Sequence, residues 1–133
     1  DGERVIASMM GLLDAYDYDD LRDMAAYYAA QQMKVGQADK ENLALGEKIY
    51  RAGNINSGVP ACTGCHGAKG KGIESAGYPM LGGQKAEYVV TSLIAYQNGN
   101  RGHDTKGKSM QGIAARLTLE EIQAVANYVS GLY

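Results

Sequence analysis

The chain lacks the residues on which many kinds of small protein depend. Its 133 residues include two cysteines, two prolines, no tryptophan and no phenylalanine, which leaves ten tyrosines as the large aromatic residues. Two cysteines exclude a disulfide-rich scaffold. No apolar run approaches the length of a membrane span, and the first residues do not resemble a signal peptide. The length and composition therefore predict a soluble chain with room for one compact domain and little more.

The charge is small but unevenly divided along the chain. Residues 1–37 carry seven acidic and three basic groups, whereas residues 38–133 carry eight acidic and ten basic groups. A surplus of two positive charges, without a clustered Lys/Arg stripe, is too weak to attract a nucleic acid. We therefore expect no nucleic-acid partner.

The two cysteines belong to a Cys-x-x-Cys-His motif at residues 62–66. Two thiols at this spacing can each add to one vinyl group of a single haem, and the adjacent histidine is then held beneath the iron as an axial ligand. The motif predicts one covalent haem c, attached through Cys62 and Cys65, with His66 bound to the metal.

A partial internal repeat indicates how the chain is organised. Residues 8–30 align without gaps on residues 109–131, with five identical positions. Because no second Cys-x-x-Cys-His motif precedes the first copy, we expect residues 1–37 to be a remnant of the end of a preceding haem domain, made of one helix and a linker. Residues 38–133 are then expected to form a complete domain with one haem.

Helical signals dominate the pattern, and no stretch alternates like a β-strand. Thr118 and Glu121 form a capping box before an apolar stripe that ends at Gly131. The same reasoning predicts an all-α fold with helices over about 17–30, 40–52 (opened by Asp39), 85–98 and 118–130. The Gly-rich segments 64–83 and 99–112 are predicted to be loops too loose to fold without a haem to wrap around.

The sixth ligand of the predicted haem iron has two candidates. Met110 lies outside any amphipathic stripe, in a segment predicted to be a loop, and recurs as Met9 in the repeat. His103 is the competitor, and a bis-histidine site would have a lower reduction potential than a His/Met site. We favour Met110 and treat His103 as an exposed loop residue.

Several other residues are predicted to surround the haem. The Pro79 carbonyl is the best-placed acceptor for the second nitrogen of His66, and Leu81 lies on the same side. Haem propionates need hydrogen-bond donors, and the candidates are Gln84, Tyr88 and Arg101. Gly46 is expected to let the helix holding Tyr50 cross closely over the helix holding Tyr128.

Other classes of site remain alternatives at this point. Cys62, Cys65, His66 and His103 would make a Cys2His2 zinc set for an interaction module, although adjacent Cys65 and His66 would struggle to reach one tetrahedral ion. The active site of a redox dithiol lies between a strand and a helix of an α/β fold, and this sequence predicts no strand. A plain disulfide between the two cysteines would explain neither the histidine nor the glycine-rich segments. A haem enzyme or sensor would need an open sixth position.

The ordered set of motifs resembles the class I c-type cytochromes, and within them the C-terminal domain of the dihaem cytochrome c4 group. The matching positions are Cys62–His66, Tyr78-Pro79-x-Leu81-x-Gly83-Gln84, Tyr88, Asn98–Arg101 and Met110. The resemblance covers residues 38–133 in full, and residues 1–33 are similar to the end of that group's first haem domain. His103 departs from the pattern, which has a plain Asn there.

This resemblance implies helices wrapped around the haem, His66 and Met110 as axial ligands, and a carrier of single electrons that is not an enzyme. It implies that the protein carries electrons between a membrane-bound respiratory complex that oxidises quinol and a terminal oxidase. Covalent haem attachment implies export to a bacterial periplasm, free or loosely associated with the membrane. The apolar stripe of helix 17–30 is expected to be covered, either by packing on the haem domain or by self-association with another copy of the chain.

Overall fold

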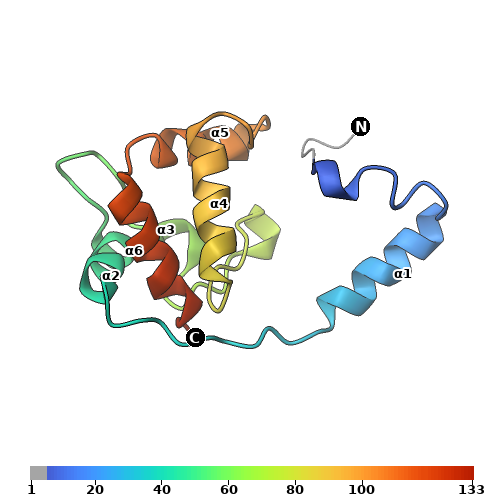
Figure 1. The fold of residues 1–133 in the computed structure, drawn as a ribbon, viewed down its shortest axis with the longest axis horizontal. Helices are drawn as coiled ribbons and strands as arrows, with labels where there is room; N and C mark the ends of the chain where they lie inside the picture. Colours follow the sequence, from blue (N-terminus) through green and yellow to red (C-terminus); the bar gives the residue numbers. More distant parts are fainter. Residues whose placement is uncertain (1–5) are drawn as a thin grey trace. The chain divides into compact units, whose positions relative to one another are not determined.

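The computed structural model describes residues 6–133 and divides the chain into two compact units, Asp1–Met33 and Lys34–Tyr133. Residues 6–133 form helices and no β-strand, apart from two isolated β-bridges, which confirms the predicted all-α class (Figure 1). None of the helices in this range has the length and apolar character needed to cross a membrane.

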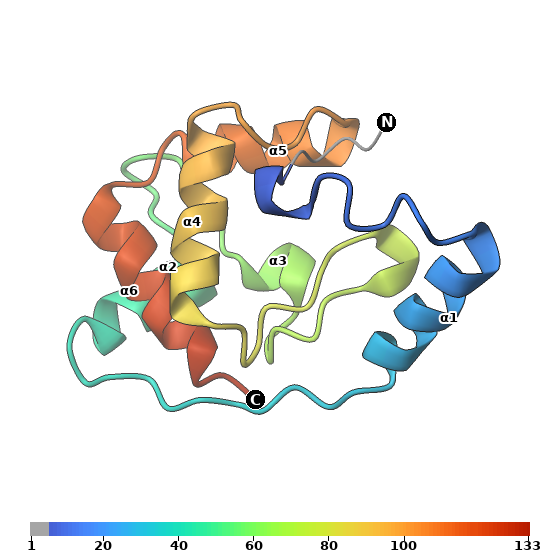
Figure 2. The ribbon, with the colours of Figure 1, turned by 45° about the vertical axis from the view of Figure 1, so that its right-hand side comes forward.

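The second unit contains five α-helices and one short 3₁₀ helix among its residues (Figures 1 and 2). Their bounds are α2, Leu43–Ala52; α3, Thr63–His66; η2, Glu74–Ala76; α4, Ala86–Gln97; α5, Thr105–Ala114; and α6, Leu119–Ser130. The core lies where α6 packs on α2 and α4, and α5 packs on α4. Side chains of α6 such as Ile122 and Val129 are almost fully buried there.

The crossing of α2 and α6 depends on Gly46. A Cβ at this position would lie 2.7 Å from the Ala124 carbonyl carbon and 2.8 Å from the Tyr128 Cβ, both inside normal contact distance. Beside it, the rings of Tyr50 and Tyr128 pack with centroids 5.5 Å apart and planes tilted by 44°. These contacts confirm the predicted close crossing.

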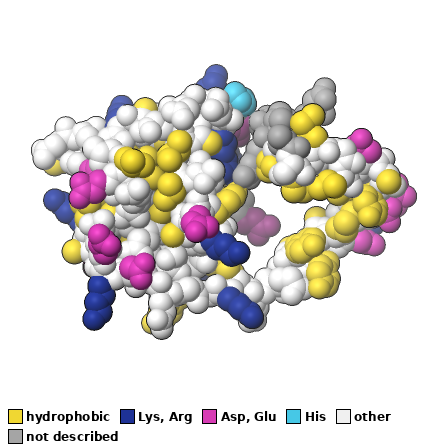
Figure 3. Space-filling model, viewed as in Figure 1, with side chains coloured by type: hydrophobic (Ala, Val, Ile, Leu, Met, Phe, Trp, Pro, Cys, Tyr) yellow, Lys and Arg dark blue, Asp and Glu magenta, His cyan; other side chains and the backbone are white. Residues whose placement is uncertain are grey.

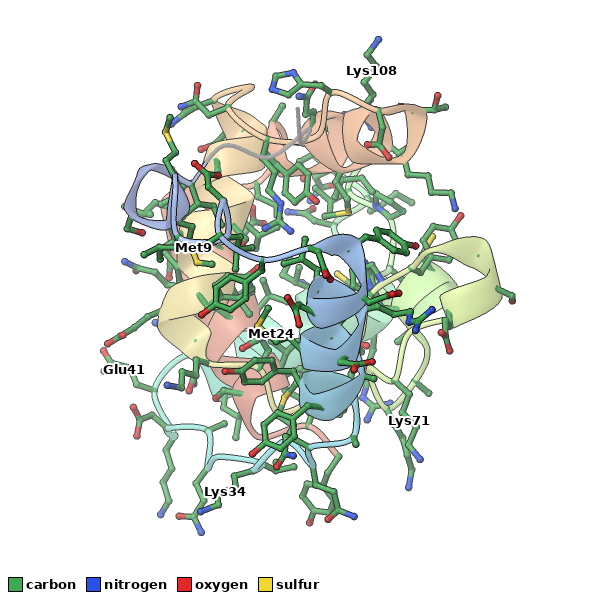
Figure 4. All side chains as sticks on the ribbon, turned by 90° about the vertical axis from the view of Figure 1, so that its right-hand side faces the viewer. Met9, Met24, Lys34, Glu41, Lys71 and Lys108 are labelled. Atoms are coloured by element: carbon green, nitrogen blue, oxygen red, sulfur yellow. The ribbon has the colours of Figure 1, made fainter. Side chains whose placement is uncertain are left out.

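The first unit contains η1 (Ala7–Met9) and α1 (Tyr18–Ala29), which includes Met24 (Figure 4). In the repeat alignment, the bounds of α1 fall on the bounds of α6. Both helices begin with a complete capping box, made by Asp17 with Asp20 in α1 and by Thr118 with Glu121 in α6. The repeat is therefore visible in local structure as well as in sequence, because the same capping signal starts both helices.

One sequence-based expectation about loops is wrong. Segment 99–112 is not a loop throughout, because α5 starts at Thr105, capped by the Asp104 carboxylate that accepts from the Gly107 amide at 2.7 Å. Segment 64–83 includes most of α3, the short helix η2 and a backbone pairing between Ile73 and Tyr78, and its need for a haem stays a prediction. Its many glycines permit tight turns that the chain stabilises with its own backbone hydrogen bonds.

The start of one helix also differs from expectation. The helix predicted from about residue 40 begins at Leu43, and its N-cap is Asn42 in the left-handed region instead of Asp39. The Asp39 backbone is used elsewhere: its amide and carbonyl both bond the Asn127 side chain on α6, each at 2.8 Å. Asp39 therefore ties the approach to α2 onto α6 and does not cap α2.

Stability is expected to fall in acid because of Glu121. Burial raises the pKa of this carboxyl group, but hydrogen bonds from the Thr118 amide and the Asn54 side chain outweigh burial, so the pKa lies below its usual value. The stabilisation is present above the unfolded-state pKa of about 4.3 and is lost as the pH falls through the lower folded-state pKa. Urea unfolding from pH 7 to pH 3 measures it. Glu121→Gln is expected to flatten the acid limb, whereas the exposed Glu120→Gln should keep the wild-type slope.

Candidate functional site

The Cys-x-x-Cys-His motif folds as a single helical turn. The amides of Cys65 and His66 both donate to the Cys62 carbonyl, at 3.3 and 2.9 Å, and Gly67 ends α3 with a positive φ of 82°. Both cysteines are half-buried, and no disulfide joins them. Burial raises the pKa of the Cys62 thiol to about 11, so this sulfur is protonated at neutral pH. The turn therefore presents two thiols and one imidazole from five consecutive residues.

His66 is the best-defined side chain of the site. It is 5% exposed, and its Nδ1 lies 2.8 Å from the Pro79 carbonyl oxygen. A carbonyl can only accept, so Nδ1 carries the proton and Nε2 keeps its lone pair for a metal. Hydrogen bonding of this kind fixes the orientation of a ligating imidazole and raises its basicity. The structure therefore brings Pro79 to His66 as the sequence predicts.

A tight glycine turn brings Pro79 to that position. The Gly72 amide donates to the His66 carbonyl at 2.9 Å, and Ile73 and Tyr78 exchange backbone hydrogen bonds at 2.9 and 3.0 Å. Gly72 has a φ of 73°, and a Cβ there would lie 2.7 Å from the Pro79 carbonyl carbon and closer still to the Tyr78 oxygen. A side chain at position 72 would therefore push the Tyr78–Pro79 peptide away from the histidine.

Tyr50 gives the site a second support, which sequence reasoning missed. Its hydroxyl donates at 2.6 Å to the carbonyl of Gly67, the residue that follows His66. Burial above all, with the nearby Cys62 and Tyr128 adding to it, raises the pKa of Tyr50 to about 12, so the hydroxyl stays a donor. Only the choice of tyrosine over phenylalanine at a buried position could have signalled this bond.

Met110 lies within α5 and is half-buried, not in a loop as predicted. Both ends of its helix are held by side chains bonded to distant carbonyls. Gln97 on α4 donates from Nε2 to the carbonyls of Ala114 and Leu117, at 3.0 and 2.9 Å, and Lys106 donates to the Ala76 carbonyl at 2.5 Å. Met110 is therefore carried on a constrained helix.

The other residues predicted to surround the haem lie among neighbours within the protein. The Gln84 side-chain oxygen accepts from the Lys85 amide at 2.9 Å. Arg101 donates to the Ser92 hydroxyl at 2.8 Å, and its guanidinium lies 4.8 Å from the centre of the Tyr96 ring. Tyr88 is 40% exposed, and half-buried Leu81 packs against the hydrophobic core. Their contacts with a haem stay predictions.

The zinc alternative finds no support in the structure. Among residues 6–133, no three or more His, Cys, Asp or Glu side chains are grouped so that they could hold a metal ion. His103 is exposed in the turn just before the Asp104 cap of α5. The free thiols and the His66 ring with an available Nε2 instead fit a covalently attached haem, which needs thioether positions and one imidazole.

Basic side chains on the face seen in Figure 3 do not form one stripe. In Figure 3, Lys and Arg side chains stand apart from one another across the visible face and are interspersed with acidic ones. Lys71 and Lys108 extend away from the ribbon (Figure 4). A distribution of this kind is typical of solubilising surface charge.

Comparison with known proteins identifies the family. The cytochrome c family profile matches residues 43–132. Cytochrome c4 of Pseudomonas aeruginosa is 47% identical over 133 residues, which is all of this chain and 66% of that protein. The crystal structure of reduced recombinant cytochrome c4 from Pseudomonas stutzeri superposes with a TM-score of 0.91 at 42% identity, covering 98% of this chain and 68% of the other. The chain therefore belongs to the cytochrome c family, with the class I c-type fold.

Within that family, the similarity is to cytochrome c4. A more distant relative, the thiosulfate dehydrogenase electron acceptor of Thiomonas intermedia, is 31% identical over 137 residues, covering 98% of this chain and 60% of that protein. The chain thus spans less than two thirds of the length of the curated relatives it matches, 66% of the first and 60% of the second. The cytochrome c family implies covalent haem c, and Cys62 and Cys65 fit its attachment motif.

Proposed function

We propose that this chain is a one-electron carrier with one haem c, ligated by His66 and Met110, that passes electrons towards a terminal oxidase. The observation that carries the proposal is the His66–Pro79 hydrogen bond of 2.8 Å within the Cys-x-x-Cys-His turn, because it leaves Nε2 as a metal ligand in a fixed orientation. The haem supplies the reversible one-electron chemistry of its iron. The protein supplies the ligands, their orientation and the exclusion of water.

The choice of Met110 over His103 rests on burial and constraint. Met110 is half-buried on a helix whose two ends are held by Gln97 and Lys106, whereas His103 is exposed in the preceding turn. A thioether ligand favours ferrous iron and raises the reduction potential above that of a bis-histidine site. We assign Met110 as the sixth ligand. With the sixth position filled, the chain is a carrier and not an enzyme or a ligand sensor.

The surrounding assignments belong to the same proposal. Residues 38–133 form a complete domain with one haem, and residues 1–37 correspond to the end of a preceding domain with its linker. Leu81 lines the proximal side. Gln84, Tyr88 and Arg101 donate to the propionates, whose charges need donors where water is excluded. For Gln84, the free amide nitrogen is the donor, because its oxygen already accepts from Lys85.

The relatives support the proposed partners and location. Haem c attachment and the cytochrome c4 relatives support a bacterial periplasm, free or loosely membrane-associated, with a quinol-oxidising complex as electron donor. A second donor is favoured by two relatives named thiosulfate dehydrogenase electron acceptor, at 31% and 42% identity. We therefore include a sulfur-oxidising dehydrogenase as the alternative donor to the same haem.

Oxidase-driven turnover tests the function. The haem-loaded protein, reduced by ascorbate, is mixed with bacterial membranes that contain a cytochrome c oxidase. We expect cyanide-sensitive reoxidation, followed by the loss of the reduced haem absorbance, at a rate that rises with membrane concentration. Reduction by a quinol-oxidising complex or by thiosulfate dehydrogenase with thiosulfate then separates the two donors. A reduced protein that membranes leave unoxidised, but that binds carbon monoxide readily, would instead have an open sixth position.

A further inference from the structure

One side chain joins the helix of Met110 to the segment of Pro79. The Lys106 ammonium, in the first turn of α5, donates to the Ala76 carbonyl in η2 at 2.5 Å. Among the hydrogen bonds of residues 6–133, this one alone links α5 to residues 72–80. Other bonds near this end, from the Gly107 amide to Asp104 and from Gln111 to the Arg101 carbonyl, stay within residues 101–111.

The backbone turn around Ala76 leaves room for the Lys106 side chain. Gly77 follows Ala76 with a φ of 70°, and a Cβ there would lie 3.4 Å from both Cδ and Cε of Lys106 and closer to its Nζ. The lysine stem therefore lies along a turn that leaves space for it because residue 77 has no side chain. The same turn has its backbone closed by the Ile73–Tyr78 pairing, so the carbonyl is presented on a constrained loop.

The two linked segments lead to the two proposed axial positions. Lys106 and Met110 are four residues apart on α5, so their side chains lie on the same face of the helix. Ala76 lies three residues before Pro79, whose carbonyl accepts from His66. The C-terminal end of α5 is held separately by Gln97, so losing the Lys106 bond would release the N-terminal end without undoing the helix.

We propose that Lys106 is a positioning residue for Met110: its bond to Ala76 holds the Met110 face of α5 towards the loop that supports His66. The inference rests on the proposed function, because it takes Met110 as the sixth ligand. Lys106 acts through the backbone and has no role as a ligand. Its loss should weaken retention of the methionine while the hydrophobic core of α2, α4 and α6 stays intact.

The test uses the haem-loaded full chain with Lys106→Met, which keeps the apolar stem and removes the donor. Two measurements are taken along a urea titration: the weak sulfur-to-iron absorption band near the red edge and the helical circular dichroism. We expect the fraction of oxidised protein without the band to rise about fivefold at low urea, as for loss of one net hydrogen bond, while the unfolding midpoint stays close to wild type. Lys106→Arg should restore the band.

Lys108→Met is the matched control, because it removes the same charge from the same helix at a side chain that extends outward (Figure 4). If Lys106→Met and Lys108→Met behave alike, or if the band and the dichroism shift together, the positioning role is wrong. Met110→Ala separates this outcome from failure of the proposed function. Loss of the band in Met110→Ala supports the ligand assignment, whereas an unchanged band overturns that assignment and the role of Lys106 with it.

Discussion

Replacing Gly46 with alanine is expected to lower the free energy of unfolding by about 3 kcal/mol, the upper range for overpacking a core. The added Cβ would be placed against the Ala124 carbonyl and the Tyr128 Cβ, and both neighbours belong to α6, which is buried along this side. Backbone atoms cannot move aside as a flexible side chain does. Relief would require α2 and α6 to separate, which would also part the Tyr50 and Tyr128 rings.

Gly112→Ala is the matched control for this substitution. Gly112 also lies inside a ten-residue helix, but a Cβ there meets nothing within 4 Å. Alanine is favoured over glycine in a helix interior by about 1 kcal/mol, so Gly112→Ala should stabilise or leave stability unchanged. Chemical denaturation of both variants measures the contrast. Equal midpoints for the two variants would show that the crossing can open at little cost.

The sequence predicted the helices whose signals are local. The capping box of α6 and the apolar stripes of α1 and α6 are contained within a few turns, so the positions of these two helices could be read to within a residue or two. Helix α5 was missed because it contains Gly107 and Gly112 and has a weak apolar stripe. Its stability comes from Asp104, Gln97 and Lys106, which bond across distances that periodicity does not reveal.

The candidate site divides in the same way. The thiols, the imidazole and the Pro79 acceptor were predictable, because the motif is contiguous and the proline lies 13 residues further on in a short loop. The Tyr50 hydroxyl and the Lys106 ammonium were not predictable, because each bonds a backbone carbonyl, 17 and 30 residues away. A carbonyl is present at every residue, so the sequence contains no mark of which one is used.

These supports converge on the backbone around His66. Its carbonyl accepts from Gly72, its ring donates to Pro79, and the following carbonyl accepts from Tyr50. The backbone and ring of the histidine are therefore held by three hydrogen bonds that come from different parts of the chain. Preorganisation of this kind keeps the ligand geometry constant between oxidation states, which is what a carrier of single electrons requires.

Gly72→Ala is expected to break this arrangement at Pro79. Alanine at a φ of 73° costs about 1–2 kcal/mol for the left-handed backbone alone. The added Cβ would also meet the Tyr78–Pro79 peptide, and the exposed loop can yield only by carrying the Pro79 carbonyl away from His66. We expect a total loss of about 2–4 kcal/mol in the free energy of unfolding, because overpacking adds to the backbone cost.

Gly67→Ala isolates the contact with Pro79. Gly67 has a φ of 82°, so alanine is strained there as well, but a Cβ at that position meets nothing within 4 Å. In the haem-loaded protein, an imidazole without its carbonyl partner is a weaker donor to iron, so ferric iron is less stabilised. The reduction potential of Gly72→Ala should therefore rise relative to wild type, whereas Gly67→Ala should lose stability with little change in potential. Equal potentials in the two variants would mean that the Pro79 carbonyl stays bonded to His66 despite the added methyl group, or that this bond does not tune the iron.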